Sequence, residues 1–263
     1  MKISWKKVSI AIACLAVISY LIIAAVNFSG KSATEVCRGV QISVMDSATT
    51  HFITPDEVGR ILNNHAVSML GVTMHHIHLS AIDNLIAKNP YVDNVECYKT
   101  LDGNVKINVW QRQPIAEVMG LNNYYIDNQM HKLPVLNGRP AFVPIISGTF
   151  NDTFLRKNLF PFVLYIHQNE FWNAQIEQIY LQSDSLIELV PRLGDCIINL
   201  GTVDRYEQKM NKLMELYQYA LNHVGWNRYS YIDLQYKDRV ICTKKDIETK
   251  PSGQQDQQTN NTF

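Results

Sequence analysis

The sequence predicts the fold class α+β: a single N-terminal transmembrane helix, then a β-α-α-β-β domain, then a mixed, mostly antiparallel β domain with packed helices. Three observations predict it. Residues 8–28 carry no charge. Helical and strand-like periodicities then alternate up to residue 112, and short strand patterns separated by turn residues follow. The boundaries we expect are a stub at 1–7, a membrane helix at 8–28, domains at 36–112 and 113–245, and a disordered tail at 246–263.

The uncharged stretch 8–28 is long enough to cross a membrane. As a helix it would span about 30 Å, the thickness of the hydrocarbon core. Lys2, Lys6 and Lys7 precede it, whereas mixed charges follow it. This bias predicts a cytoplasmic N-terminus and an extracytoplasmic body. The rival interpretation is a cleaved signal peptide, but such peptides have apolar regions of about 7–15 residues, and Val26 makes a poor cleavage site.

The charge balance of the chain beyond the predicted membrane segment limits the kinds of partner that it can bind. Removing the three lysines of the first 28 residues leaves 21 Lys+Arg against 24 Asp+Glu, which argues against nucleic acid. The cysteines beyond the membrane segment have no metal-ligand spacing, and nothing in the sequence selects a disulfide pairing. We therefore expect most of them to be small core residues. They are Cys37, Cys97, Cys196 and Cys242.

The first domain begins with a strand at 36–44. A helix follows, with Thr54 as N-cap, Pro55 at the first helical position and Glu57 completing a capping box. Ser80 has the same spacing to Asp83 and predicts a second helix start.

A hairpin completes this domain. Asn89-Pro90 ends the second helix, and 91–99 alternates as a strand. Asp102-Gly103 is a turn signal, and residues 105–109 alternate on the return strand.

The second domain shows short strand candidates and two helices. One helix is predicted from about Pro161 to Asn169, and a stronger one has its apolar face between Tyr206 and Leu221. Residues 231–236 form a further strand that could continue through 240–242 past a bulge at Lys237-Asp238. The other strand candidates are 115–119, 123–127, 141–146, 176–181, 186–191 and 196–200. The Gln- and Asn-rich end lacks apolar residues, so we expect disorder.

Several motifs in this order resemble the FtsQ/DivIB family of bacterial division proteins, whose first domain after the membrane is a POTRA domain. IAKNPYVDNV (86–95) resembles the family's "Pro-aromatic-Val" entry to the second strand, and RQPIA (112–116) its "Arg-x-Pro-x-Ala" exit from the third. NYYID (123–127), INLG (198–201) and YIDLQY (231–236) are similar to motifs of its β domain. Gln235 stands where the family usually has arginine, which puts any argument on that charge in doubt.

The resemblance implies a non-catalytic scaffold of the divisome in the inner membrane, with a periplasmic body concentrated at the septum. It would support septum formation and septal peptidoglycan synthesis. It implies recruitment of the small coiled-coil proteins FtsB and FtsL by β-strand addition at the last strand, with Tyr236 as the contact aromatic. The expected partner-binding residues are Tyr231, Leu234, Tyr236, Asp238, Val240 and Cys242.

No catalytic, cofactor or metal constellation is expected. The sequence contains no GxSxG, HExxH, Walker or dinucleotide motif. His75, His76 and His78, with His65 upstream, precede the Ser80 helix start, and a solvated loop is the expected setting. The aromatic residues between 160 and 172 are expected in the core, with a partner surface as the alternative. Two other functions stay open: a different POTRA-bearing envelope assembly or secretion component, and a membrane-anchored cell-wall enzyme.

Overall fold

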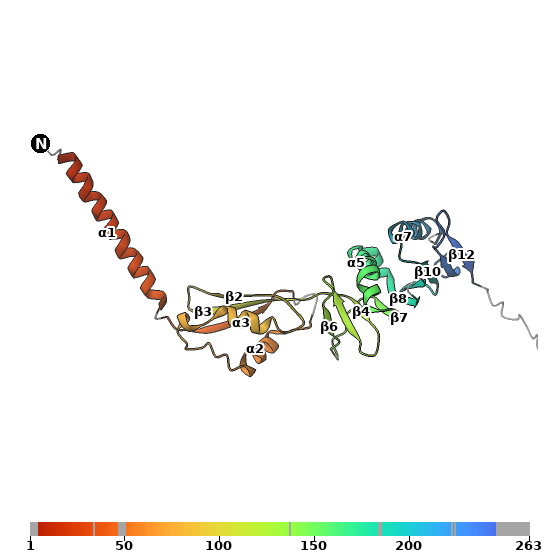
Figure 1. Ribbon diagram of the computed structural model, residues 1–263, viewed down its shortest axis with the longest axis horizontal. Coiled ribbons are helices and arrows are strands. Elements are labelled where there is room, and N and C mark those ends of the chain that lie inside the picture. Colours follow the sequence, from red (N-terminus) through yellow and green to blue (C-terminus); the bar gives the residue numbers. More distant parts are fainter. Residues whose placement is uncertain are drawn as a thin grey trace, which may run out of the picture. The chain divides into compact units, whose positions relative to one another are not determined.

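The computed structural model describes residues 5–33, 35–46, 51–136, 138–183, 186–221, 223 and 225–245. The predicted tail 246–263 lies outside these residues. The chain forms two compact units (Figure 1). Unit 1 contains residues 1–113 and 132–141, and unit 2 contains residues 114–131 and 142–263. The elements confirm the α+β class.

The N-terminal helix α1 spans Trp5–Ala33. Within the described part of the chain, no helix is both long and apolar enough to qualify as a membrane span. The transmembrane segment 8–28 stays a prediction from the sequence.

Unit 1 places two helices on a three-stranded sheet, and its elements follow the predicted order (Figure 1). The sheet order is β1-β3-β2, with β1 parallel and β2 antiparallel to the central β3. Every second side chain of β3 is buried among residues from the two helices. The elements are β1 (Gly39–Val44), α2 (Pro55–Asn64), α3 (Leu79–Ile86), β2 (Val92–Lys99) and β3 (Asn104–Gln111).

The start of α2 confirms the capping-box prediction. Thr54 accepts from the Glu57 N–H, and Glu57 accepts from the Thr54 N–H at 2.8 Å. Arg139 donates to Glu57 and to the Phe52 carbonyl, which attaches residues 132–141 to unit 1. Burial tends to raise the pKa of Glu57, but hydrogen bonds from Arg139 and Thr54 lower it overall.

The predicted start of α3 at Ser80 is wrong by two residues. His78 is the N-cap, and no side chain caps the helix. Ser80 lies inside the first turn. The buried faces of Leu79–Ile86 set this boundary through packing, which overrides the local capping signal.

Unit 2 is built on a mixed sheet whose strands run in the order β12-β11-β10-β9-β8-β7-β4-β5. All predicted strands are present, although the third begins later than expected, at Ile145. The strands are β4 (Pro114–Val118), β5 (Tyr124–Asp127), β7 (Ile145–Gly148), β8 (Ile176–Ser183), β9 (Leu186–Pro191), β10 (Ile197–Gly201), β11 (Tyr229–Asp233) and β12 (Ile241–Lys244). The short β6 (Lys132–Pro134) was not predicted and groups with unit 1.

Helices pack against this sheet and bury most of the predicted aromatic cluster. Phe162 and Trp172 are fully buried, and Phe160 and Tyr165 pack partly buried against the same core. The core prediction is confirmed for these four rings, whereas the fifth, Phe171, is exposed. The helical elements are α4 (Asp152–Phe154), a π-helical segment (Leu155–Leu159), α5 (Phe160–Gln168), α6 (Glu170–Gln175), α7 (Tyr206–Glu215) and a second π-helical segment (Leu216–Leu221).

Candidate functional site

The candidate site is the hairpin formed by β11 and β12 at one end of the unit 2 sheet. β11 pairs in parallel with β10 and antiparallel with β12, in a register that places Ile232 opposite Cys242. The prediction of one long strand with a bulge at Lys237-Asp238 is therefore wrong. The chain reverses between residues 234 and 240 and returns as a separate strand.

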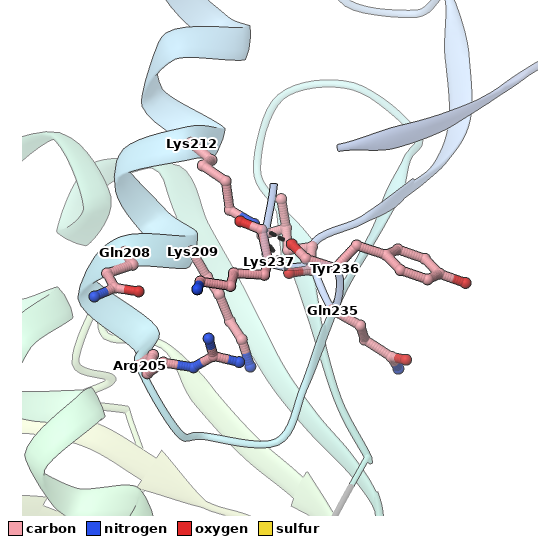
Figure 2. Close-up of a pocket in the computed structure, with 8 residues that line it drawn as sticks. Arg205, Gln208, Lys209, Lys212, Gln235, Tyr236 and Lys237 are labelled. Atoms are coloured by element: carbon pink, nitrogen blue, oxygen red, sulfur yellow. Dashed lines mark hydrogen bonds between the residues drawn. The ribbon is translucent and has the colours of Figure 1, made fainter. Parts of the chain in front are cut away.

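Lys212 of α7 explains this reversal. Its Nζ donates to the carbonyl oxygens of Leu234 (3.5 Å), Tyr236 and Lys237 (3.4 Å). Figure 2 shows the Lys212 side chain extending from α7 to this loop, while the Tyr236 ring points away from the helix. Three carbonyls converging on one ammonium group hold the backbone out of strand geometry.

A second lysine of α7, Lys209, lies one helical turn before Lys212 and binds carbonyl groups at the end of the neighbouring strand β10. Lys209 is buried, and its Nζ donates to the carbonyls of Leu200 (3.0 Å), near the end of β10, and of Thr202 (2.6 Å), just after it. Burial, and then the nearby Arg205, lower the pKa of Lys209. The carboxyl ends of two parallel strands are thus both held by α7.

Gly201 allows the loop after β11 to pass close to β10. Its φ is +70°, and a Cβ there would lie 2.6 Å from Gln235 Cγ. The backbone conformation therefore favours glycine, and any larger residue would also force the Gln235 side chain to move. This gives a physical reason for the Leu-Gly pair seen in the sequence.

Backbone alternation along β11 determines which residues face β12. Leu234 donates its N–H to Asn199 O of β10 at 2.9 Å. Since successive residues point their backbone groups to opposite sides, Asp233 faces β12 and its partner Ile241 faces β11.

A hydrogen bond at the other end of β12 also shows that its odd-numbered residues face β11. Lys245 donates its N–H to Arg228 O at 3.1 Å, so Thr243 also faces β11. The backbone groups of Cys242 and Lys244 consequently point away from the sheet. Within the described ranges no strand pairs with this outer side of β12.

The predicted site residues divide between surface and interior. Tyr236 is 47% exposed and Asp238 is exposed, both in the loop. Val240 and Cys242 are partly buried on the core-facing side of the edge segment. Tyr231 is half-buried on the inner strand β11, and Leu234 is fully buried. Leu234 therefore packs in the core beneath the site and is not part of its surface.

The cysteine side chains near the site favour the neutral thiol form. Burial raises the pKa of the Cys242 thiol and of Cys196, which disfavours the reactive thiolate. All the cysteines are free. No metal-binding group of three or more His, Cys, Asp or Glu side chains occurs among residues that the structure describes. His75 and His76 lie in a 3-10 turn, Met74–His76, before the His78 cap.

Sequence reasoning missed Lys209 and Lys212. Their signal was weak: two lysines three positions apart on a helix usually indicate a solvated face. Their role becomes visible only from the carbonyl groups that they bind at the ends of β10 and β11, which lie 7 to 25 residues away in the sequence.

We expect Lys212→Met to loosen the loop without unfolding unit 2. Charge-assisted hydrogen bonds contribute about 1.5–3 kcal/mol, and methionine retains the length of the apolar stem. Hydrogen exchange of the backbone amides in 234–240 should become faster, while exchange in β8 and β9 stays unchanged. Lys157→Met, which alters an exposed lysine of the same unit, should leave the loop unaffected. Unchanged exchange in Lys212→Met would show that the three contacts do not hold the loop.

Two sequence models of known protein families match this chain, one in each of its two predicted domains. The sequence model described as "FtsQ/DivIB, C-terminal related" matches residues 113–243, and that described as "POTRA-like domain" matches residues 35–110. The chain is 24% identical over 227 residues to "Cell division protein FtsQ" of Geotalea daltonii, an alignment covering 79% of this chain and 82% of that protein. These matches show that the chain belongs to the FtsQ/DivIB family of cell-division proteins.

Proposed function

We propose that the protein is a non-catalytic, membrane-anchored scaffold of the divisome. It recruits the small coiled-coil proteins FtsB and FtsL by β-strand addition to the outer edge of β12, and thereby supports septal peptidoglycan synthesis. The observation that carries the proposal is the outward-facing backbone of Cys242 and Lys244, which has no partner strand in the described part of unit 2.

An open edge of this kind favours a partner strand for two reasons. Main-chain donors and acceptors supply affinity, and neighbouring side chains supply selectivity. β12 is held in place by β11 on one side and by the Lys245–Asp195 ion pair (2.8 Å) at its end. A partner would therefore meet a preformed edge and would lose little binding energy to ordering it.

The proposed membrane anchoring and cellular location rest on the sequence. The uncharged stretch 8–28 and the lysines before it favour a single-pass inner-membrane protein with residues 1–7 in the cytoplasm. The POTRA-like domain at 36–112 and the β domain at 113–245 would then lie in the periplasm, at the septum where division proteins act.

The edge hypothesis predicts that Lys244→Pro weakens partner binding. Proline removes the outward N–H and places a ring against the incoming strand. We expect a loss of at least about 1 kcal/mol, or roughly fivefold in affinity. The measurement is quantitative mass spectrometry of the proteins recovered with the tagged full chain from cross-linked membranes.

Lys244→Ala is the matched control, because it removes the same exposed side chain and keeps the N–H. It should bind like the wild type. Equal recovery from the proline and alanine variants would exclude hydrogen bonding at this position.

Tyr236→Ala tests the side-chain contribution. The ring is half exposed, and Arg239 lies 5.9 Å from its centroid. If the partner covers this ring, its loss should cost about 2 kcal/mol or more of binding free energy. Since the side chain points away from α7 (Figure 2), the melting temperature should not change. Unchanged partner recovery would remove Tyr236 from the contact surface.

Recovery of FtsB- and FtsL-like single-span proteins, reduced by both substitutions, is the result we expect. Recovery of outer-membrane assembly factors, or of peptidoglycan fragments alone, would contradict the scaffold function.

A further inference from the structure

The two edge strands of the unit 1 sheet, β1 and β2, differ in how well they are protected against pairing with another chain. The proposed function does not involve either of them. β2 (Val92–Lys99) carries Asp93, Glu96 and Lys99 and a register shift near its start. Charges and bulges of this kind discourage pairing with other chains. β1 (GVQISV, Gly39–Val44) has no charge, no proline and an unbroken register with β3. Its outer edge is therefore unprotected.

The chain already uses the beginning of this edge. Residues 71–74 run antiparallel to residues 35–37, with Gly71 donating to Cys37 O (2.9 Å) and Met74 donating to Glu35 O (2.8 Å). This pairing ends before Gly39. Among the residues described in unit 1, no strand continues it along β1.

A groove accompanies the open part of the edge. Two hollows of about 500 and 440 Å³ share the same central residues on β1 and α2, which are Val40, Ile42, Gly59 and Asn63. The second hollow extends along residues 66–70, where Leu70 is 62% exposed. Val40 and Ile42 contribute apolar side chains to the groove, and the polar residues Asp56, Arg60 and Asn63 also line it.

Gly59 is an independent sign that the groove receives another chain. It lies in the interior of α2, where glycine disfavours the helix relative to alanine. Its φ is not positive. A Cβ there would have a single neighbour within 4 Å, Ile42 Cδ1 at 3.9 Å. Neither the backbone nor the packing of unit 1 requires glycine, whereas a side chain here would project into the groove.

The chemistry that fits is an uncharged strand with β-branched side chains at alternate positions. β1 itself has this pattern: Val40, Ile42 and Val44 lie on the core-facing side, and Gln41 and Ser43 face solvent. The edge is thus complementary to its own sequence, as a two-fold interface requires. We propose that unit 1 self-associates, with β1 of a second copy pairing antiparallel to β1 and its apolar side chains entering the groove beside α2.

The test is the oligomeric state of the purified full chain in detergent micelles, measured by analytical ultracentrifugation over a concentration series. We expect a monomer–dimer equilibrium that Gly59→Leu weakens at least tenfold. The melting temperature of this variant should not fall, because leucine favours the helix. Gly120→Leu is the control, since Gly120 lies in an open loop of unit 2, and it should leave the equilibrium unchanged.

A photo-reactive benzoyl-phenylalanine at the exposed position Gln41 identifies the occupant directly. The supporting result is a covalent product of twice the chain mass, cross-linked to residues 39–44 or 59–70. A chain that stays monomeric at every concentration would overturn the proposal. So would a dimer insensitive to Gly59→Leu, as expected for association through another segment, and so would cross-links formed only with other proteins.

Discussion

Trp172→Ala should lower the free energy of unfolding of unit 2 by about 3–5 kcal/mol, the usual range for deleting a buried tryptophan. Trp172 is 1% exposed. Its ring centroid lies 4.9 Å from that of Phe171 and 5.9 Å from that of Tyr217, which in turn stacks on Trp226 at 5.0 Å. The substitution removes a fully buried ring from a four-ring cluster that has Tyr217 at its centre and joins α6, the second π-helical segment and the residues before β11.

The measurement is urea unfolding of the full chain, followed by hydrogen exchange in β8–β10 so that unit 2 is observed separately from unit 1. Phe171→Ala is the matched control, because this ring belongs to the same cluster but is 38% exposed. Its cost should be about 1–2 kcal/mol. Equal losses for the two variants would contradict the burial of Trp172 as the cause of the larger loss.

Gly148→Ala should also destabilise unit 2, by about 2–5 kcal/mol. The residue ends β7 with φ +105°, a conformation that L-residues rarely adopt. An added Cβ would lie 2.0 Å from Leu181 O, the same oxygen that accepts the N–H of Thr149 at 2.7 Å. Backbone strain and overpacking therefore act together, and the β7–β8 pairing must shift.

Thermal unfolding checks this expectation, with Gly120→Ala as the control. Gly120 has no positive φ and no atom within 4 Å of its ideal Cβ, so its replacement should be neutral or slightly stabilising. A melting temperature for Gly148→Ala equal to that of Gly120→Ala would contradict the packing at the end of β7.

Sequence patterns predicted those parts of the fold in which residues close in the sequence form hydrogen bonds with each other. The Thr54–Glu57 box needs atoms only three positions apart, so α2 could be located from the sequence. Ser80 shows the limit of this reasoning. The same spacing to Asp83 is present, but burial of Ile82 and Ile86 decides where α3 lies, and the sequence does not show what those residues pack against.

The candidate site was only partly predictable for the same reason. Alternation placed a strand at 231–236 and an apolar stretch at 240–242, but no local pattern showed that Lys212 would draw the intervening carbonyls towards α7. A continuous strand and a hairpin differ here by contacts across more than 20 residues. The direction in which Cys242 and Lys244 present their backbone was equally hidden, because it follows from pairing with β11.

The position of β12 at the end of the sheet also sets the order of events during synthesis. β12 leaves the ribosome after every other described strand, so the presentation of its outer edge depends on nearly all of unit 2 having been translated. A nascent chain stopped before Ile241 would present the edge of β11 instead, with the opposite strand direction. Under the proposed function, chains released early would therefore lack the docking edge, and only chains translated through β12 would bind the partner.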